Sequence, residues 1–228
     1  MPRLMSHRTM SGDFAAILLD VDGTLVDSTP AVERTWRTWA DARGLDAEEI
    51  LRQSHGRRSE DTIAALLPLG DRVAGVKDLL ALELNDLEGV VALPNAASLL
   101  ESLPANRWAA VTSGSRELMQ RRLSTAGLTL PSVLVTAEDV TAGKPDPEGY
   151  LAAAAALGVD AAACLVIEDA PAGIKSGRAS GAFVVAVATS HPRQALSDAD
   201  VVIDDLGACK VTATKNGLHL TVTVAGRH

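Results

Sequence analysis

Residues 15–24 read Ala-Ala-Ile-Leu-Leu-Asp-Val-Asp-Gly-Thr, and this stretch decides the fold. The unbroken apolar run before Asp20 predicts a short strand that is buried on both faces of a sheet. Asp20 and Asp22 stand where that strand ends. Two carboxylates at such a position are costly unless a cation or hydrogen bonds compensate them. The stretch therefore predicts a buried strand that delivers two carboxylates to a polar site.

Strand and helix patterns alternate along the chain from residue 94 onward. Gly127 and Gly158 stand where two of the helices are expected to end. This alternation predicts an α/β fold with a Rossmann-like parallel sheet and helices on both of its faces. The expected strands are residues 108–112, 132–135, 164–167, 183–188 and 201–203, and the expected helices are residues 96–103, 117–126, 147–157 and 172–180.

The region before residue 94 has no strand-like run after the first strand, and its apolar residues recur at helical spacing. We therefore expect an all-helical insertion. The predicted organisation is an α/β catalytic core of residues 12–28 and 92–228 with a helical cap domain of residues 29–91.

The two ends of the chain carry different signals. Residues 211–224 alternate apolar and polar side chains around Asn216-Gly217, the strongest short-range signal for a C-terminal β-hairpin. The residues up to about Ser11 are expected to form a disordered tail. No apolar stretch follows the basic start, so we expect no secretory signal.

The charge balance excludes some classes of partner. The 228 residues include 21 Lys and Arg against 29 Asp and Glu, a formal net charge of −8. An acidic chain with scattered charges has no electrostatic footprint for nucleic acid, and no apolar stretch approaches the roughly 20 residues of a membrane helix. Two cysteines, Cys164 and Cys209, make no disulfide framework. We expect a cytoplasmic protein that binds neither nucleic acid nor membrane.

Ligands of open parallel sheets bind beyond the carboxyl ends of the strands, so the residues that follow the expected strands should share one crevice. Taken singly, these residues have ordinary structural interpretations as solvated acids, turn formers and a surface lysine. Together they offer carboxylates, hydroxyls and one cation. They are Asp20, Asp22, Thr112, Ser113, Lys144, Glu168 and Asp169.

Two other motifs are excluded. A calcium loop that starts at Asp20 needs glycine where Leu25 stands and glutamate where Ala31 stands. A nucleotide P-loop at Lys144 needs Ser or Thr next, where the chain has Pro145.

In this order the elements resemble the pattern of the haloacid dehalogenase superfamily of phosphotransferases, over residues 15–203. The pattern is Asp-x-Asp-Gly-Thr, then Ser or Thr after the next strand, then a lysine and an acidic pair. Residues 20–28, 55–58, 143–147 and 167–174 are similar to the small sugar or polyol phosphate phosphatases of that superfamily, which carry the helical insertion as a cap.

The resemblance implies phosphoryl transfer through an aspartyl-phosphate at Asp20. It implies Mg²⁺ held by Asp20, the main-chain carbonyl of Asp22 and Asp169, with Glu168 as a further ligand or as a contact of the ligands. Asp22 would protonate the leaving alkoxide and later deprotonate water, a role that burial of its carboxyl group would favour. Lys144 would neutralise the phosphate and the nucleophile.

The resemblance also implies residues that hold the substrate. Ser113 or Thr112, with the amide of Gly114, would bind phosphate oxygens. Gly23 would allow the turn after the strand, and Thr24 would orient Asp22. On the cap, Arg57 and Arg58 are candidate substrate contacts, with a solvated helix start as the alternative. The expected partner is a small phosphorylated metabolite, bound by a monomer or weak homodimer.

Two other functions stay open. A sugar-phosphate mutase similar to β-phosphoglucomutase would return the phosphate to an isomer. Mutases of that type carry a histidine about a dozen residues after the nucleophile, where this chain has Val32, and this favours hydrolysis. The other is a non-enzymatic module that binds a metal or a partner, against which the retention of every motif residue argues.

Overall fold

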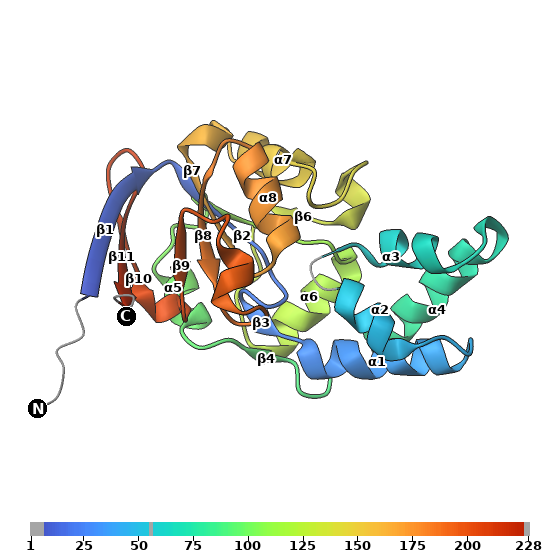
Figure 1. The fold of residues 1–228 in the computed structure, drawn as a ribbon. Helices are drawn as coiled ribbons and strands as arrows, with labels where there is room; N and C mark the ends of the chain where they lie inside the picture. Colours follow the sequence, from blue (N-terminus) through green and yellow to red (C-terminus); the bar gives the residue numbers. More distant parts are fainter. Residues whose placement is uncertain (1–6, 55–56, 226–228) are drawn as a thin grey trace, which may run out of the picture.

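The computed structural model describes residues 7–54 and 57–225. Its centre is a six-stranded, parallel sheet with the order β6-β5-β2-β7-β8-β9 (Figure 1). The α/β fold predicted from the alternating pattern is therefore confirmed. The strands are β2 (Ala16–Leu19), β5 (Trp108–Val111), β6 (Leu134–Val135), β7 (Cys164–Glu168), β8 (Phe183–Val187) and β9 (Val201–Ile203).

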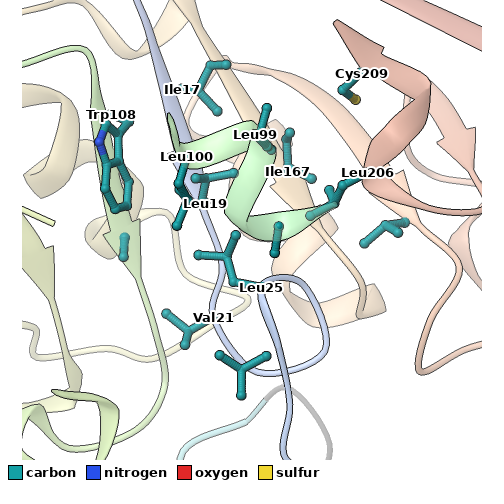
Figure 2. Packing of buried hydrophobic residues seen from close by; sticks show 14 of the residues in the cluster. Ile17, Leu19, Val21, Leu25, Leu99, Leu100, Trp108, Ile167, Leu206 and Cys209 are labelled. Atoms are coloured by element: carbon teal, nitrogen blue, oxygen red, sulfur yellow. The ribbon is translucent and has the colours of Figure 1, made fainter. Parts of the chain in front are cut away.

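Alternate residues of β2 pack into two different hydrophobic clusters, because successive side chains of a strand point to opposite faces of the sheet. Ile17 and Leu19 pack with residues of helices α5 and α6, and Figure 2 shows part of this cluster. Ala16 and Leu18 pack with residues of α7 and α8. Both faces of the sheet are thus covered. The helices are α5 (Ala96–Glu101), α6 (Arg116–Thr125), α7 (Glu148–Ala156) and α8 (Pro171–Ala179).

Between β2 and α5, the described residues form four α-helices with a hydrophobic cluster of their own, to one side of the sheet in Figure 1. Strands β3 (Val26–Asp27) and β4 (Val91–Ala92) pair antiparallel, so the chain leaves and re-enters the sheet region at adjacent points. Trp39 is fully buried in the cluster, and its ring nitrogen donates to the carbonyl of Gly75 at 2.8 Å. The helical pattern expected for this insertion is observed. Its helices are α1 (Thr29–Asp41), α2 (Ala47–Ser54), α3 (Ser59–Leu66) and α4 (Arg72–Asn85).

A separate antiparallel sheet corrects the expectation for the N-terminus. Strand β1 (His7–Phe14) pairs with β11 (Leu218–Ala225), which pairs on its other side with β10 (Cys209–Ala213). The expected disordered tail is therefore wrong from His7 onward, and residues 1–6 lie outside the described residues. The predicted hairpin of β10 and β11 is present, and it leaves one edge of β11 for β1. An unpaired edge of backbone donors and acceptors readily takes up another strand.

Within residues 7–54 and 57–225, no helix is both long enough and apolar enough to cross a membrane.

Candidate active site

The strand order reverses at β2. The chain continues from β2 to β5 and β6 on one side, and β7, β8 and β9 lie on the other. Such a switch point is where open parallel sheets bind ligands. Asp20 follows β2 and Asp169 follows β7, its direct neighbour. One oxygen from each of Asp20, Glu168 and Asp169 lies within 4.8 Å of the others, so the structure joins acids that are far apart in the sequence.

Lys144 lies inside this acidic cluster. Its Nζ donates to Asp20 Oδ1 at 2.6 Å, to Glu168 Oε1 at 2.6 Å and to the carbonyl of Val111 at 3.2 Å. An ammonium group has three protons, and all three are used here. Burial alone would lower the pKa of Lys144, but Asp20 and Glu168 outweigh it and raise the pKa. Lys144 is therefore a buried cation, and its interpretation as a surface lysine is wrong.

Glu168 already accepts four hydrogen bonds. Oε1 accepts from Lys144 and from the hydroxyl of Tyr150 at 2.9 Å, and Oε2 accepts from the amides of Asp169 and Ala170 at 3.0 and 3.2 Å. A Cβ at Gly173 would lie 1.7 Å from Oε1, so α8 can approach this carboxylate only with glycine there. Because a carboxylate accepts about four such bonds, Glu168 orients its neighbours and has no open oxygen.

Hydroxyl groups from two loops hold Asp169. Its Oδ1 accepts from Thr24 at 3.4 Å, and its Oδ2 accepts from Ser190. Gly23 has a φ of +86°, and a Cβ there would lie 2.0 Å from Asp169 Oδ2, so this close turn requires glycine. The expectation that Thr24 orients Asp22 is wrong, because its hydroxyl is directed to Asp169 instead.

The cluster fits a small divalent cation. Burial raises the pKa of Asp20 to about 7 and raises that of Asp169 well above its usual range. Within the described residues, Asp20 Oδ2 is buried and has no hydrogen-bond partner. When all three carboxyl groups are ionised, they exceed the one ammonium group by two negative charges, which one divalent cation would neutralise. Oxygen donors of this kind suit Mg²⁺.

The predicted phosphate-binding loop follows β5, on the other side of β2. Thr112, Ser113 and Gly114 all line a cavity in front of the acidic cluster. The amide of Gly114 donates to Thr112 Oγ1 at 3.1 Å, so in this structure it is directed at that hydroxyl. Ser113 is more exposed than Thr112, whose exposed fraction is 7%. Ser113 is therefore the better presented of the two hydroxyl residues.

Asp22 also lines the cavity, but its hydrogen-bond partners differ from those of the acidic cluster. Its Oδ1 accepts from Ser28 at 2.7 Å and its Oδ2 from Arg122 Nη1 at 2.7 Å. Its side chain is 29% exposed, so the expected burial of Asp22 is not found. Arg122 also donates to Glu83 of α4 at 3.2 Å. Burial raises the pKa of the Glu83 carboxyl group, and Arg122 opposes that shift.

The cavity has a volume of about 130 Å³ and lies between the carboxyl ends of the strands and the helical insertion. Its walls combine charged, hydroxyl and apolar side chains. They include Asp20, Asp22, Ser113, Arg122 and Asp169 from the core, and Val32, Trp36, Arg57, Leu80 and Glu83 from the insertion.

The two arginines predicted as substrate contacts lie in different places. Arg57 is exposed and lines the cavity. Arg58 forms an ion pair with Asp61 at 3.1 Å and donates to the carbonyl of Val140 at 3.4 Å. Arg58 thus connects the insertion to the loop before Lys144. The preceding residues of the same motif, 55 and 56, lie outside the described residues.

Sequence reasoning missed residues that complete the site. Ser190 could have been found, because it follows β8 at the same edge of the sheet as the acidic residues. Glu83, Arg122 and Tyr150 lie in helices whose local sequence does not distinguish them from other helical residues. Ser28 lies just after the Asp20–Thr24 motif, whose pattern does not assign it a role. The missed residues are Ser28, Glu83, Arg122, Tyr150 and Ser190.

A comparison with protein families agrees with this geometry. Residues 14–181 match the family model described as haloacid dehalogenase-like hydrolase. The chain belongs to this family. The matched range contains every acidic residue of the cluster and Lys144, so the resemblance inferred from the motifs is confirmed.

Similar curated proteins are named as phosphatases. Hexitol phosphatase A of Escherichia coli (strain K12) is 42% identical over 205 residues, which cover 88% of this chain and 95% of that protein. The 2-deoxyglucose-6-phosphate phosphatase 2 of Saccharomyces cerevisiae is 37% identical over 231 residues, which cover 90% and 94%. The prediction of a phosphoric monoester hydrolase is confirmed, and the non-enzymatic alternative is not supported.

Solved structures of other proteins are also similar to this chain in fold. A hydrolase from Pseudomonas syringae has a TM-score of 0.77 and 26% identity, and the likeness covers 84% of this chain and 94% of that one. A β-phosphoglucomutase from Clostridium difficile has a TM-score of 0.75 at 21% identity, covering 84% and 91%, and this likeness shows the fold alone. With relatives named as phosphatases, the mutase alternative is not favoured.

Proposed function

We propose that this protein is a Mg²⁺-dependent phosphatase that hydrolyses a small sugar or polyol phosphate monoester through an aspartyl-phosphate at Asp20. The observation that carries the proposal is the position of Asp20, a buried carboxylate at the strand switch point that contacts Lys144 and lines the cavity. The charged and hydroxyl side chains that line the cavity and the names of relatives, among them a glycerol-1-phosphate phosphohydrolase of Saccharomyces cerevisiae, support a small polyhydroxylated substrate.

The donor set supports a specific assignment for the metal. Asp20, the main-chain carbonyl of Asp22 and Asp169 would hold Mg²⁺, and Glu168 would position Lys144 because its oxygens are already hydrogen-bonded. The cation supplies positive charge that stabilises the phosphoryl group as it is transferred between anions.

The proposed reaction has two steps, phosphoryl transfer to Asp20 and hydrolysis of the aspartyl-phosphate, and Asp20 and Asp22 have distinct roles in them. Asp20 attacks phosphorus, the bond from phosphorus to the leaving oxygen breaks, and Asp22 gives that oxygen a proton. Water next attacks the phosphorus of the aspartyl-phosphate and loses its proton to Asp22, which frees Asp20 and inorganic phosphate. The Ser113 hydroxyl holds phosphate oxygens, and Lys144, whose protons are donated to Asp20, Glu168 and Val111, supplies positive charge beside the nucleophile.

In this proposal residues 29–91 act as a cap over a core of residues 12–28 and 92–228. The cap contributes the part of the cavity wall that meets the non-phosphate end of the substrate, including Arg57. Val32 also lines the cavity, and an apolar side chain there cannot exchange protons with a sugar hydroxyl. This supports hydrolysis over phosphate return to an isomer.

The test is a phosphate-release assay with Mg²⁺ over a panel of sugar and polyol phosphates. Asp20→Asn should reduce turnover below roughly 10⁻⁴ of the wild-type rate, as loss of a nucleophile does. Asp198→Asn, which changes an exposed carboxyl group, is the matched control and should be fully active. Acid quenching with ³²P-labelled substrate should leave label on the wild-type chain and none on Asp20→Asn. An active Asp20→Asn variant, or a wild type inert toward the whole panel, contradicts the proposal.

A further inference from the structure

Arg122 connects the helical insertion to Asp22. Its Nη1 donates to Asp22 Oδ2 at 2.7 Å, and its Nη2 donates to Glu83 Oε1 at 3.2 Å. Arg122 belongs to α6, which covers the sheet, whereas Glu83 belongs to α4 of the insertion. All three residues line the cavity. One planar guanidinium group therefore joins the carboxylate beside the nucleophile to the insertion.

Stability alone does not account for this triad. The side chains of Arg122 and Glu83 are only 4% and 9% exposed. Buried ion pairs can often be replaced by apolar residues without loss of stability. Among the described residues, only Asp20 Oδ2 and Arg122 Nε are buried side-chain atoms without a hydrogen-bond partner, and an unpaired buried donor is unfavourable. Both atoms belong to residues that line the same cavity, so the triad lies at the site and not in a hydrophobic cluster.

The neighbouring Arg121 provides an internal comparison. It donates to Glu117 at 2.8 Å on its own helix and to the carbonyl of Leu84 on α4 at 3.3 Å, and its side chain is 48% exposed. Arg121 thus also connects α6 to α4, but within the part of the chain that the structure describes its guanidinium group does not contact Asp22. Contact between the two helices does not by itself require the buried Arg122.

We propose that Arg122 is a positioning residue for Asp22, and that Glu83 holds the guanidinium group from the insertion. The inference rests on the proposed function, in which Asp22 transfers the proton. Arg122 holds Oδ2 and Ser28 holds Oδ1, which fixes the plane of the carboxyl group while leaving lone pairs for a further contact. Because the guanidinium fork is rigid, its orientation depends on Glu83 and therefore on the position of α4. Proton transfer is in this way coupled to the insertion that meets the substrate.

Substrates with different leaving groups distinguish a role of Arg122 in positioning Asp22 from a purely structural role. An alkoxide must be protonated as it leaves, whereas p-nitrophenolate is a stable anion and leaves without a proton. The kcat/KM of each substrate reports the first phosphoryl transfer. Arg122→Gln should lower kcat/KM for the best alkyl phosphate of the panel by roughly 10²-fold, the low end of what general acid catalysis contributes, and that for p-nitrophenyl phosphate by less than about tenfold.

The control is Arg121→Gln, which should leave both values within about twofold of wild type. Glu83→Gln should show the same selective loss as Arg122→Gln at a smaller size, about tenfold for the alkyl phosphate. Thermal unfolding is measured for each variant to show that it is folded. If Arg122→Gln does not fold, the single variants Arg122→Lys and Glu83→Gln are compared with wild type on the same two substrates. Losses that are absent, or equal for the two substrates, overturn the inference and leave the phosphatase proposal intact. A wild type without activity on either substrate overturns the proposed function instead.

Discussion

The two walls of the cavity are built differently. The wall at the strand ends is lined by Asp20 and Asp169, and Lys144 and Glu168 lie next to them without lining the cavity. None of the four residues is more than 8% exposed, and Asp20 Oδ2 has no hydrogen-bond partner among the described residues. The wall toward the insertion includes Val32 and the exposed Arg57, and its shape depends on where the helices of the insertion lie. Adjacent parallel strands fix the first wall, so it is suited to chemistry that tolerates little displacement. The second wall is suited to selecting the substrate, and the predictions below test this division.

The largest effect should come from withholding the Mg²⁺ that we propose for the acidic cluster. Chelation with EDTA should abolish phosphatase activity, and added Mg²⁺ should restore it. Asp169→Asn should lower kcat/KM at least roughly 10³-fold, because the cation and its ligand stabilise charge in the transition state. Mg²⁺ should also raise the Tm of the wild type, since a ligand that binds only the folded state stabilises it, and should not raise that of Asp169→Asn.

The exposed carboxyl variant Asp198→Asn serves as control for both readouts and should respond to Mg²⁺ as the wild type does. A wild type whose activity and Tm are the same with EDTA and with Mg²⁺ would show that the acidic cluster holds no catalytic metal.

The second prediction concerns stability. Lys144→Met leaves Asp20 and Glu168 as buried carboxylates without their cation. Breaking a buried pair in this way should lower the free energy of unfolding by about 3–5 kcal/mol, measured by urea denaturation in EDTA, and should abolish activity. The exposed Lys175→Met on α8 is the control, with an expected change within about 0.5 kcal/mol. Similar losses for both lysines would mean that Lys144 does not hold the first wall together.

Residues that adjacent strands place could be predicted from the sequence, whereas residues that helix packing places could not. The proximity of Asp20 and Asp169 could be predicted, because runs of apolar residues identify β2 and β7, and the carboxyl ends of parallel strands lie at one edge of the sheet. The ion pair between Asp22 and Arg122 could not, because it depends on how α4 and α6 pack, which local periodicity does not encode. Strand β1 was missed for a similar reason: its residues have no apolar run, and only pairing with β11 makes them a strand.

The third prediction resolves the ambiguity between Thr112 and Ser113. Ser113→Ala should lower kcat/KM by about 10–100-fold, the value of a hydrogen bond to a charged phosphate oxygen. Thr112→Val should have the smaller effect on activity, because its hydroxyl accepts from the Gly114 amide within the loop. Steady-state kinetics of the two variants with one substrate decide between them. The reverse order of effects would make Thr112 the residue that holds the phosphate.

The smallest effect should come from the second wall. Arg57→Gln should raise KM about two- to fivefold with kcat unchanged, because an exposed cation contributes modestly to binding an anionic substrate. The difference from wild type should shrink as salt increases, since exposed charges are screened. Arg52→Gln on α2, whose arginine is exposed and pairs with Glu49, is the control and should leave KM unchanged. If Arg57→Gln instead lowers kcat at constant KM, Arg57 acts on the transition state, and the division between a wall for chemistry and a wall for selection fails.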